Sequence, residues 1–230
     1  MKKKLLVVEP HSDDGLIAVG GFLEKNRDRY DYYFVLAVCS AIPLNHNNHQ
    51  TREARLSEFK NYVDYFEGEW LQSDNTDIDL PLDKDAELDM YPKKLLVKQI
   101  ETVVGIVKPD VVMCTGPSFH QDHTAVYEAL IAATRPTALH YPDEFYILEN
   151  PTYVHSSGPM TKFIPDTYVA LTEHEVDMKV ELFRRFFPSQ IRDEGNALSG
   201  SGIKSWARYR GIEARSEFAE ALQTFSRILR

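Results

Sequence analysis

The sequence predicts an α/β protein with a Rossmann-like, mainly parallel β-sheet flanked by helices, folded as a single domain over residues 1–230. Two observations predict this class. Short apolar runs alternate along the chain with segments in which apolar residues recur at helical spacing. Strands that alternate with helices of this length are typical of βαβ units and a parallel sheet. A chain of 230 residues is also long enough to bury a sizeable core.

The predicted strands are short and apolar. Leu5–Glu9 has the continuous apolar pattern of a strand that is buried on both faces. Tyr32–Cys39 is rich in aromatic and β-branched residues, which favour strands, and Val111–Thr115 is a third run of the same kind. Because ligands bind at the carboxyl ends of the strands in such sheets, we expect the chemistry directly after each of these three strands.

The predicted helices have apolar residues at i, i+3, i+4 and i+7, which places them on one face. Prolines after several of these segments mark where the helices end. The segments are residues 20–29, 59–66, 96–107, 124–134 and 176–187.

Two stretches fit neither pattern. Ser73–Pro92 is rich in aspartate and is expected to be an irregular surface excursion, either a plain solvated loop or a lid over the site. Leu198–Ile203, with the sequence Leu-Ser-Gly-Ser-Gly-Ile, is expected to be a flexible loop that closes over a ligand or merely connects two elements.

Composition excludes several classes of protein. The net charge of −9 argues against a nucleic acid as the main partner, because such binding needs concentrated Lys and Arg. The two cysteines, Cys39 and Cys114, both lie in predicted strands, so no disulfide framework is expected. No run approaches the ~20 apolar residues of a membrane span, and the first apolar run is too short for a signal peptide. We therefore expect a cytoplasmic protein.

Two His/Asp clusters lie where the sheet rule places a site. Pro10–Gly15 follows the first strand, and His120–His123 follows the third and opens a helix. Each cluster alone has an ordinary explanation, since Asp-Asp-Gly is common at turns and helix starts and His-x-x-His is often two surface residues of one helix. Their joint occurrence at the ends of two strands favours a functional site.

The donor types in these clusters suit a divalent metal. Imidazole nitrogen and carboxylate oxygen suit zinc and similar ions, and a catalytic zinc takes three protein ligands and a water. The first cluster can supply two ligands and the second a third, which leaves one aspartate beside the bound water. Because the metal lowers the pKa of that water from 15.7 towards ~7, a carboxylate is an adequate base. The sequence thus predicts a metal-dependent hydrolase.

The same segments resemble the motifs of the PIG-L/LmbE-type zinc-dependent deacetylases, which remove N-acetyl groups from amino sugars. Residues 10–14 resemble the Pro-His-Pro-Asp-Asp signature, with Ser12 in place of its second proline, and residues 20–21 match the glycine pair that follows it. Residues 120–123 resemble the second motif, His-Pro-Asp-His, with Gln in place of Pro. Members often carry Glu two positions after the aspartate pair, where this chain has Leu16; that departure bears on the substrate rather than the metal.

Weaker likenesses extend through most of the chain. Arg55–Glu58 resembles the family's Arg-x-x-Glu, and Phe218–Leu222 resembles the Tyr-Ala-Glu-Ala-Phe ending of its bacterial branch. Residues 163–166, Lys179 and residues 189–190 resemble its C-terminal half.

The resemblance implies a role for each matching residue. The implied zinc ligands are His11, Asp14 and His123, with Fe2+ or Co2+ as alternative metals. Asp13 is implied as the general base, His120 as the acid or oxyanion stabiliser, Asp122 as the residue that orients it, and Arg55 as a substrate contact. We expect Asp122 to raise the pKa of His120 and keep that ring charged.

The expected reaction is removal of an N-acetyl group from an N-acetylglucosamine-type conjugate by a zinc-bound water. The alternatives are another amide or ester hydrolase on the same metal site and a metal-binding scaffold without turnover. Retention of Asp13 and His120 argues against the scaffold, because neither is needed to hold zinc. No Gly-x-Gly-x-x-Gly follows the first strand, which disfavours a dinucleotide site. The expected partner is a small-molecule amino-sugar conjugate, and a homo-oligomer stays open.

For other polar and aromatic residues, the sequence allows either a role in the pocket or an ordinary structural role. Arg52 competes with Arg55 for the substrate contact, and Arg55 is favoured because Glu58 lies three residues later. The remaining groups are His46 with His49, residues 140–144, and the set of Trp206, Tyr209 and Arg210, which could stack on a sugar ring or fix the C-terminal segment.

Overall fold

The fold is built around a seven-stranded sheet with the strand order β5-β2-β1-β6-β7-β9-β8. The computed structural model describes residues 2–45, 48–72, 78–156 and 163–229. The parallel strands are β1 (Lys3–Glu9), β2 (Tyr30–Leu36), β5 (Glu69–Trp70), β6 (Val111–Thr115) and β7 (Glu144–Leu148). β9 (Phe218–Arg227) runs antiparallel both to β7 and to the edge strand β8 (Thr167–Leu171). The sheet is therefore mainly parallel, as predicted.

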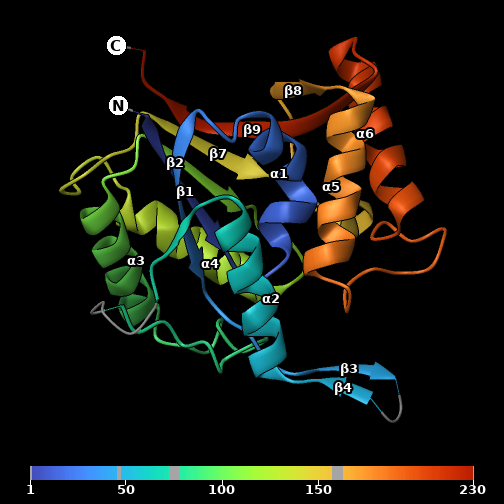
Figure 1. The fold of residues 1–230 in the computed structure, drawn as a ribbon. Helices are drawn as coiled ribbons and strands as arrows, with labels where there is room; N and C mark the ends of the chain where they lie inside the picture. The colour runs from blue at the N-terminus through green and yellow to red at the C-terminus, as the bar shows by residue number, and fades with distance from the viewer. Residues whose placement is uncertain (1, 46–47, 73–77, 157–162, 230) are drawn as a thin grey trace.

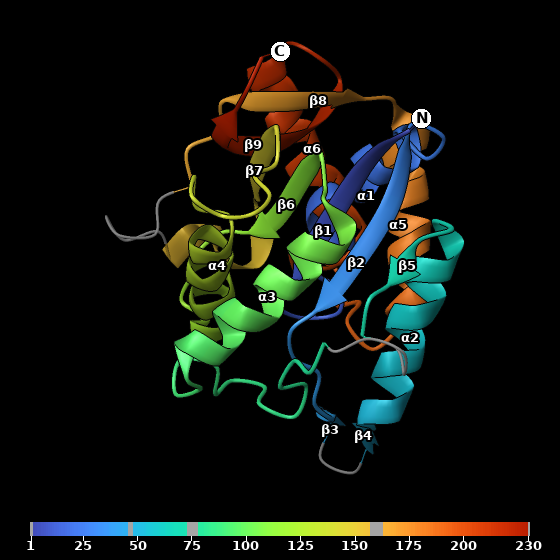
Figure 2. The ribbon, with the colours of Figure 1, turned by 90° about the vertical axis from the view of Figure 1, so that its left-hand side faces the viewer.

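Helices cover both faces of this sheet (Figures 1 and 2). One face carries α3 (Lys93–Val107) and α4 (Gln121–Ala133), and the other carries α1 (Asp14–Lys25), α2 (Arg52–Tyr65) and α5 (Glu173–Phe186). Successive residues of β1 alternate between the two cores, with Leu5 and Val7 on the α1 side and Leu6 and Val8 on the α3 side. This explains why β1 reads as an unbroken apolar run. None of the described helices is long and apolar enough to cross a membrane.

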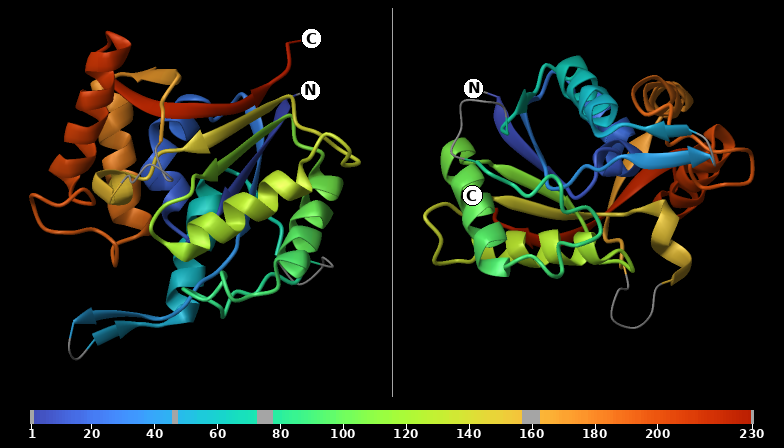
Figure 3. Two further views of the ribbon diagram at one scale, coloured as in Figure 1. Left: turned by 180° about the vertical axis from the view of Figure 1, so that it is seen from behind. Right: turned by 90° about the horizontal axis from the view of Figure 1, so that it is seen from below.

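The predicted strands and helices are present, with shifted boundaries. α1 begins at Asp14, inside the first cluster rather than after it, and α2 begins at Arg52. Four strands of the main sheet, β5, β7, β8 and β9, were not predicted as strands, nor was the short antiparallel pair of β3 (Ile42–Asn45) and β4 (Asn48–Gln50). That pair stands away from the main sheet (Figure 3).

The expectation of a flexible loop at Leu198–Ile203 is wrong, because helix α6 (Gly200–Ala214) begins inside it. The hydroxyl of Ser199 accepts a hydrogen bond from the amide of Gly202 at 2.9 Å and caps the helix. A Cβ at Gly202 would lie 2.0 Å from the carbonyl oxygen of Asn196. The glycine there allows close packing of the chain on itself, so it marks a fixed helix start rather than a hinge.

The backbone of helix α1 departs from helical geometry at Val19. A buried ion pair between Lys179 and Glu220 lies at this break, and Glu220 binds backbone amides that follow it. The carboxylate of Glu220 accepts hydrogen bonds from the amides of Gly21 at 2.8 Å and Phe22 at 2.7 Å. The ammonium group of Lys179 lies 2.7 Å from the same carboxylate. Two of the weaker family likenesses, on α5 and β9, thus meet at one point on α1 and hold it in place.

The glycine pair after the first motif has a packing reason. A Cβ at Gly21 would lie 2.5 Å from Leu171 Cδ1, and one at Gly20 would lie 2.9 Å from Leu16 Cδ1 and 3.1 Å from Lys179 Cγ. α1 can therefore approach β8 and α5 this closely only where it carries no side chain. Because Asp14 is the first residue of α1, the position of this helix also sets the position of the site.

Candidate metal centre

An open cleft of about 340 Å³ lies where the carboxyl ends of β1, β6 and β7 meet. Both predicted clusters line it, together with side chains from segments that the sequence left open. The lining residues are His11, Asp13, Asp14, Arg55, Asp85, His120, His123, Asn150, Thr152, Tyr153, Gln190, Arg192, Asn196 and Leu198. The sheet rule therefore located the cleft correctly.

The three predicted metal ligands present their donor atoms as a compact triangle. His11 Nδ1 lies 3.1 Å from His123 Nε2, and Asp14 Oδ2 lies 3.4 Å from each of these nitrogens. With bonds of 2.0–2.1 Å to zinc, tetrahedral ligand atoms are about 3.3–3.4 Å apart. The donor set thus fits a zinc-sized ion, and its three residues line the open cleft.

Asp14 is held by groups on both of its oxygens. Oδ1 accepts a hydrogen bond from the Asn150 side-chain amide at 2.8 Å, and Oδ2 accepts one from the backbone amide of His11 at 2.9 Å. Burial alone would raise the pKa of Asp14, but the rings of His123 and His11 outweigh it and hold that pKa far below its usual range. Asn150 was not identified from the sequence; its only signal is that it is a polar residue two positions after the last residue of β7.

Ser118 orients the second histidine. Its hydroxyl oxygen lies 2.8 Å from His123 Nδ1 and accepts a hydrogen bond from the His120 backbone amide at 3.0 Å. We infer that His123 carries its proton on Nδ1 and donates it to this oxygen, which leaves the lone pair of Nε2 facing the triangle. Ser118 was also missed, because a serine in a loop after a strand carries no distinctive signal.

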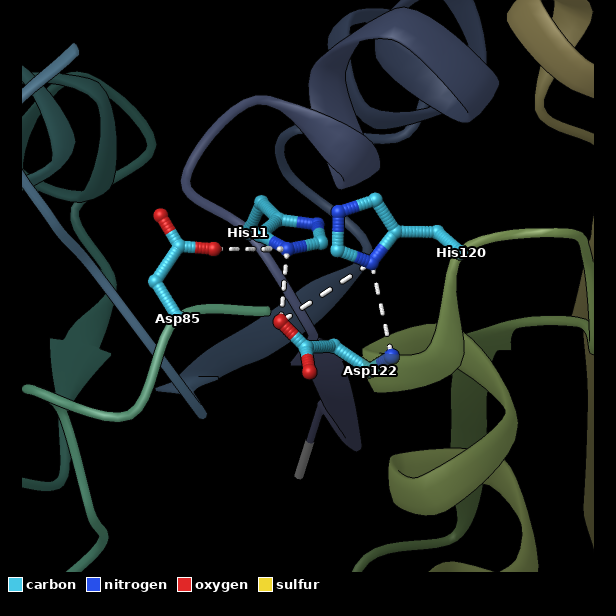
Figure 4. A group of neighbouring side chains, drawn as sticks. All are labelled: His11, Asp85, His120 and Asp122. Carbon is cyan, nitrogen blue, oxygen red and sulfur yellow. Dashed lines mark hydrogen bonds and ion pairs between the residues drawn. The ribbon is translucent and has the colours of Figure 1, made fainter. Parts of the chain in front are cut away.

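The far nitrogen of His11 faces two carboxylates (Figure 4). His11 Nε2 lies 3.3 Å from Asp122 Oδ2 and 3.4 Å from Asp85 Oδ1. Asp122 Oδ2 is farther from the residue that it was expected to orient, at 3.8 Å from His120 Nδ1. Asp122 is therefore closer to His11 than to His120. A carboxylate commonly supports a metal-ligating histidine in this way.

The aspartate-rich segment Ser73–Pro92 is more than a solvated loop. Its residues 73–77 lie outside the described part of the chain, but the rest reaches the cleft and brings Asp85 to His11. The buried carboxylate of Asp122 fixes it there by accepting hydrogen bonds from the amides of Ala86 at 2.6 Å and Leu88 at 3.0 Å. Asp85 was missed because the sequence does not say which of several aspartates in an irregular segment turns inward.

His120 differs from expectation in the direction of its pKa shift. Burial lowers its pKa, and the facing rings of His11 and His123 lower it further, whereas Asp122 raises it by less. His120 Nδ1 also accepts a hydrogen bond from the Asp122 backbone amide at 3.4 Å, so this nitrogen presents a lone pair and caps α4. The surroundings of His120 therefore lower its pKa, whereas the sequence led us to expect that Asp122 would raise it.

Asp13 lies beside the triangle with the properties of a base. Burial and the adjacent carboxylate of Asp14 raise its pKa, while Arg55 and His11 lower it. A carboxylate with a raised pKa holds a proton more strongly than a free one. The turn that presents it needs Gly15, because a Cβ there would lie 2.5 Å from the buried carboxylate of Glu9.

Arg55, rather than Arg52, lines the cleft. Its guanidinium is buried and donates to the carbonyl of Ser40 at 2.8 Å and to the hydroxyl of Ser12 at 3.4 Å. Nη1 also lies 3.9 Å from Asp85 Oδ2. These contacts, rather than one to Glu58, fix the guanidinium, and its buried Nε makes no hydrogen bond within the described part of the chain.

Three of the remaining candidates, Trp206, Arg210 and His140, have structural partners. Trp206 Nε1 and Arg210 Nε each donate to Glu149 Oε2 at 2.9 Å and so tie α6 to the end of β7. His140 Nε2 lies 2.7 Å from the carbonyl oxygen of Pro109, near the opposite end of the sheet from the cleft. His46 lies outside the described residues, as does the side chain of His49.

The fold and the cleft together define an α/β protein with a candidate divalent-metal centre at the carboxyl edge of a parallel sheet. A family model described as "PIG-L: GlcNAc-PI de-N-acetylase" matches residues 6–134, which is more than half of the chain, and the protein belongs to this family. The matched region runs from β1 to the end of α4 and contains both halves of the donor triangle. A search of curated proteins finds no match.

Solved structures share the fold at low sequence identity. N,N'-diacetylchitobiose deacetylase from Pyrococcus horikoshii is 16% identical with a TM-score of 0.68, covering 97% of this chain and 84% of its own. The 4-carboxy-2-hydroxymuconate hydratase of Pseudomonas putida KT2440 is 18% identical with a TM-score of 0.62, covering 100% and 99%. A zinc-inhibited form of teicoplanin deacetylase is 15% identical with a TM-score of 0.66, covering 96% and 97%. At these identities the likeness establishes the fold alone, and the fold carries both deacetylase and hydratase chemistry.

Proposed function

We propose that this protein is a metal-dependent N-deacetylase that hydrolyses the N-acetyl group of an N-acetylglucosamine-type conjugate. The single observation that carries the proposal is the donor triangle of His11, Asp14 and His123 with the carboxylate of Asp13 beside it. Membership of a family described as a de-N-acetylase supports the choice of an amide as substrate.

When bound, the metal supplies a Lewis acid that polarises the acetyl carbonyl and lowers the pKa of a water towards ~7. Asp13 takes a proton from the attacking water, and its raised pKa makes it a stronger base than an ordinary aspartate. The rigid set of hydrogen bonds around Asp14 and His123 keeps the site organised between turnovers.

The leaving amine needs a proton, and His120 is the residue proposed to give it. Its ring lies 4.4 Å from that of His11 between ring centres, on the same wall of the cleft. A general acid of this kind contributes ~100- to 10,000-fold. We propose that His120 collects the proton that Asp13 takes from the water and delivers it to the leaving amine. Arg55 lies where it can contact a sugar hydroxyl or carbonyl oxygen.

Zinc is the metal that we propose, on the fit of the triangle. Fe2+ and Co2+ accept the same donors, and they need direct comparison because one deacetylase of this fold has been solved in a zinc-inhibited form.

The test is release of free amine and acetate from a panel of N-acetylglucosamine conjugates that differ in the aglycone. We expect the metal-loaded protein to release both in equal amounts, chelation to abolish release, and added zinc, Co2+ or Fe2+ to restore it. Simple esters and an unsaturated hydroxy acid in the same panel test the rival hydrolase and hydratase activities. Turnover of those compounds without any amine release would overturn the proposal.

A further inference from the structure

A second group of metal-ligating side chains lies against the first and shares His11 with it. While Nδ1 of His11 faces the donor triangle, its Nε2 faces Asp85, Asp122 and the ring of His120 (Figure 4). One donor atom from each of these four residues lies within 4.8 Å of every other. The two groups are thus joined through the two nitrogens of one imidazole.

The separations within this second group fit a zinc-sized ion nearly as well as those of the first. Nε2 of His11 lies 3.4 Å from Asp85 Oδ1 and 3.3 Å from Asp122 Oδ2, close to the ~3.3–3.4 Å between tetrahedral zinc ligands. The longest edge, 3.8 Å between Asp122 Oδ2 and His120 Nδ1, involves the most exposed of the four side chains. His120 Nδ1 accepts a long hydrogen bond of 3.4 Å from the Asp122 amide, and an ion bound to Nδ1 would take the place of that N–H.

The charges around His11 Nε2 are not balanced by a proton alone. One N–H can donate fully to only one of the two carboxylates that face it. Asp122 is already supported by two backbone amides, and the second oxygen of Asp85 accepts from the hydroxyl of Ser40. The guanidinium of Arg55 lies 3.9 Å from Asp85 Oδ2, the oxygen that does not face His11. A divalent cation in place of the proton would satisfy both carboxylates at once.

We propose that Asp85, His120, Asp122 and Nε2 of His11 form a second, weaker zinc site, and that an ion bound there inhibits the enzyme. Binding releases the Nε2 proton to solvent and leaves His11 bridging two ions. The inhibition rests on the proposed function: an ion ligated by His120 would hold this ring against His11 and Asp122, and the ring would no longer be available to the leaving amine.

The number of zinc ions bound per chain tests the site without any measurement of turnover. Untagged protein is stripped with a chelator and dialysed against graded free zinc, and the bound metal is counted by mass spectrometry. We expect two ions per chain, the second at higher free zinc. Asp85→Asn should bind one ion, because the first triangle stays intact while the second group loses a carboxylate.

Glu87→Gln is the matched control, since its exposed side chain lies in the same segment and outside both donor groups. It should bind two ions like the unaltered protein. His120→Gln removes a different ligand of the second group and serves as an independent test if Asp85→Asn disturbs the segment that carries Asp85. It should also bind one ion. Saturation of the unaltered protein at one ion would overturn the site, and so would two ions in both Asp85→Asn and His120→Gln.

Turnover then links the site to inhibition. We expect activity to rise with the first equivalent of zinc and to fall at least tenfold as the second binds. A second ion that binds without lowering activity would overturn the inhibitory role. Absence of amine release at every zinc concentration would instead refute the proposed deacetylation, while the count of bound ions would still decide the second site.

Discussion

Two polar clusters lie on helix α1, and they differ in how their charges balance. At the break in the helix, one cation and one anion, Lys179 and Glu220, pair with each other and with two backbone amides. At the start of the helix, four carboxylates, one guanidinium and three imidazole rings gather at the cleft. These groups are Asp13, Asp14, Asp85, Asp122, Arg55, His11, His120 and His123. A balanced cluster is complete as it stands, whereas a cluster with excess negative charge calls for a cation.

Charge balance distinguishes the structural polar cluster from the candidate functional one. Both clusters contain residues that the family likeness singled out, and both lie on α1. Only the cleft cluster brings histidine nitrogens and carboxylate oxygens together around a common point.

The largest expected effect is on turnover, when the spare carboxylate of the unbalanced cluster is neutralised. Asp13→Asn should lower kcat by about 10²- to 10⁴-fold, because the general base is lost, yet keep the bound metal. Kinetics on the best conjugate of the panel, together with metal analysis, would measure both. An activity near that of the unaltered protein would remove Asp13 from the mechanism.

The balanced cluster should instead respond in stability. Lys179→Met leaves Glu220 as an unpaired buried charge and should lower the free energy of unfolding by about 3–5 kcal/mol. Denaturant titration measures this change. Lys204→Met is the control, because Lys204 pairs with Asp177 at the surface, where such a pair is worth about 0–1 kcal/mol. Equal losses in the two variants would mean that the buried pair is not special.

Metal should stabilise the unbalanced cluster. Zinc at about 1,000 times its dissociation constant should raise the free energy of unfolding by about 4 kcal/mol, because only the folded chain holds the triangle together. Thermal unfolding with and without zinc measures the shift. In His123→Ala, which lacks one corner of the triangle, the shift should nearly vanish. The same shift in that variant would place the ion elsewhere.

The smallest expected effect is on zinc affinity, when a residue that hydrogen-bonds to a proposed ligand is changed. Ser118→Ala removes the group that orients His123 and should weaken metal binding about 10- to 100-fold. A competition titration with a zinc-binding dye measures this affinity. Ser189→Ala, which loses only a 3.4 Å hydrogen bond to Glu58, should leave it unchanged. If both variants bind zinc as tightly as the unaltered protein, the hydroxyl of Ser118 has no part in the metal centre.

Local patterns were reliable where one physical cause dominates. The apolar runs of β1 and β6 predicted strands because both faces of those strands are buried. β8 escaped prediction because it is an edge strand with mostly half-buried residues, so no apolar run marks it. The segment at Leu198–Ile203 was misjudged because its glycines serve close packing, which sequence composition cannot distinguish from flexibility.

The sequence by itself determined the fold class, the edge of the sheet that carries the site, and the residue types that converge there. Those follow from local spacing and from the rule that parallel strands share a carboxyl edge. Only the tertiary structure decided that Asp122 supports His11 before His120, and that Asp85, Ser118 and Asn150 complete the centre. Such contacts join segments far apart in the chain, and they depend on side-chain directions at each junction, which no local pattern encodes.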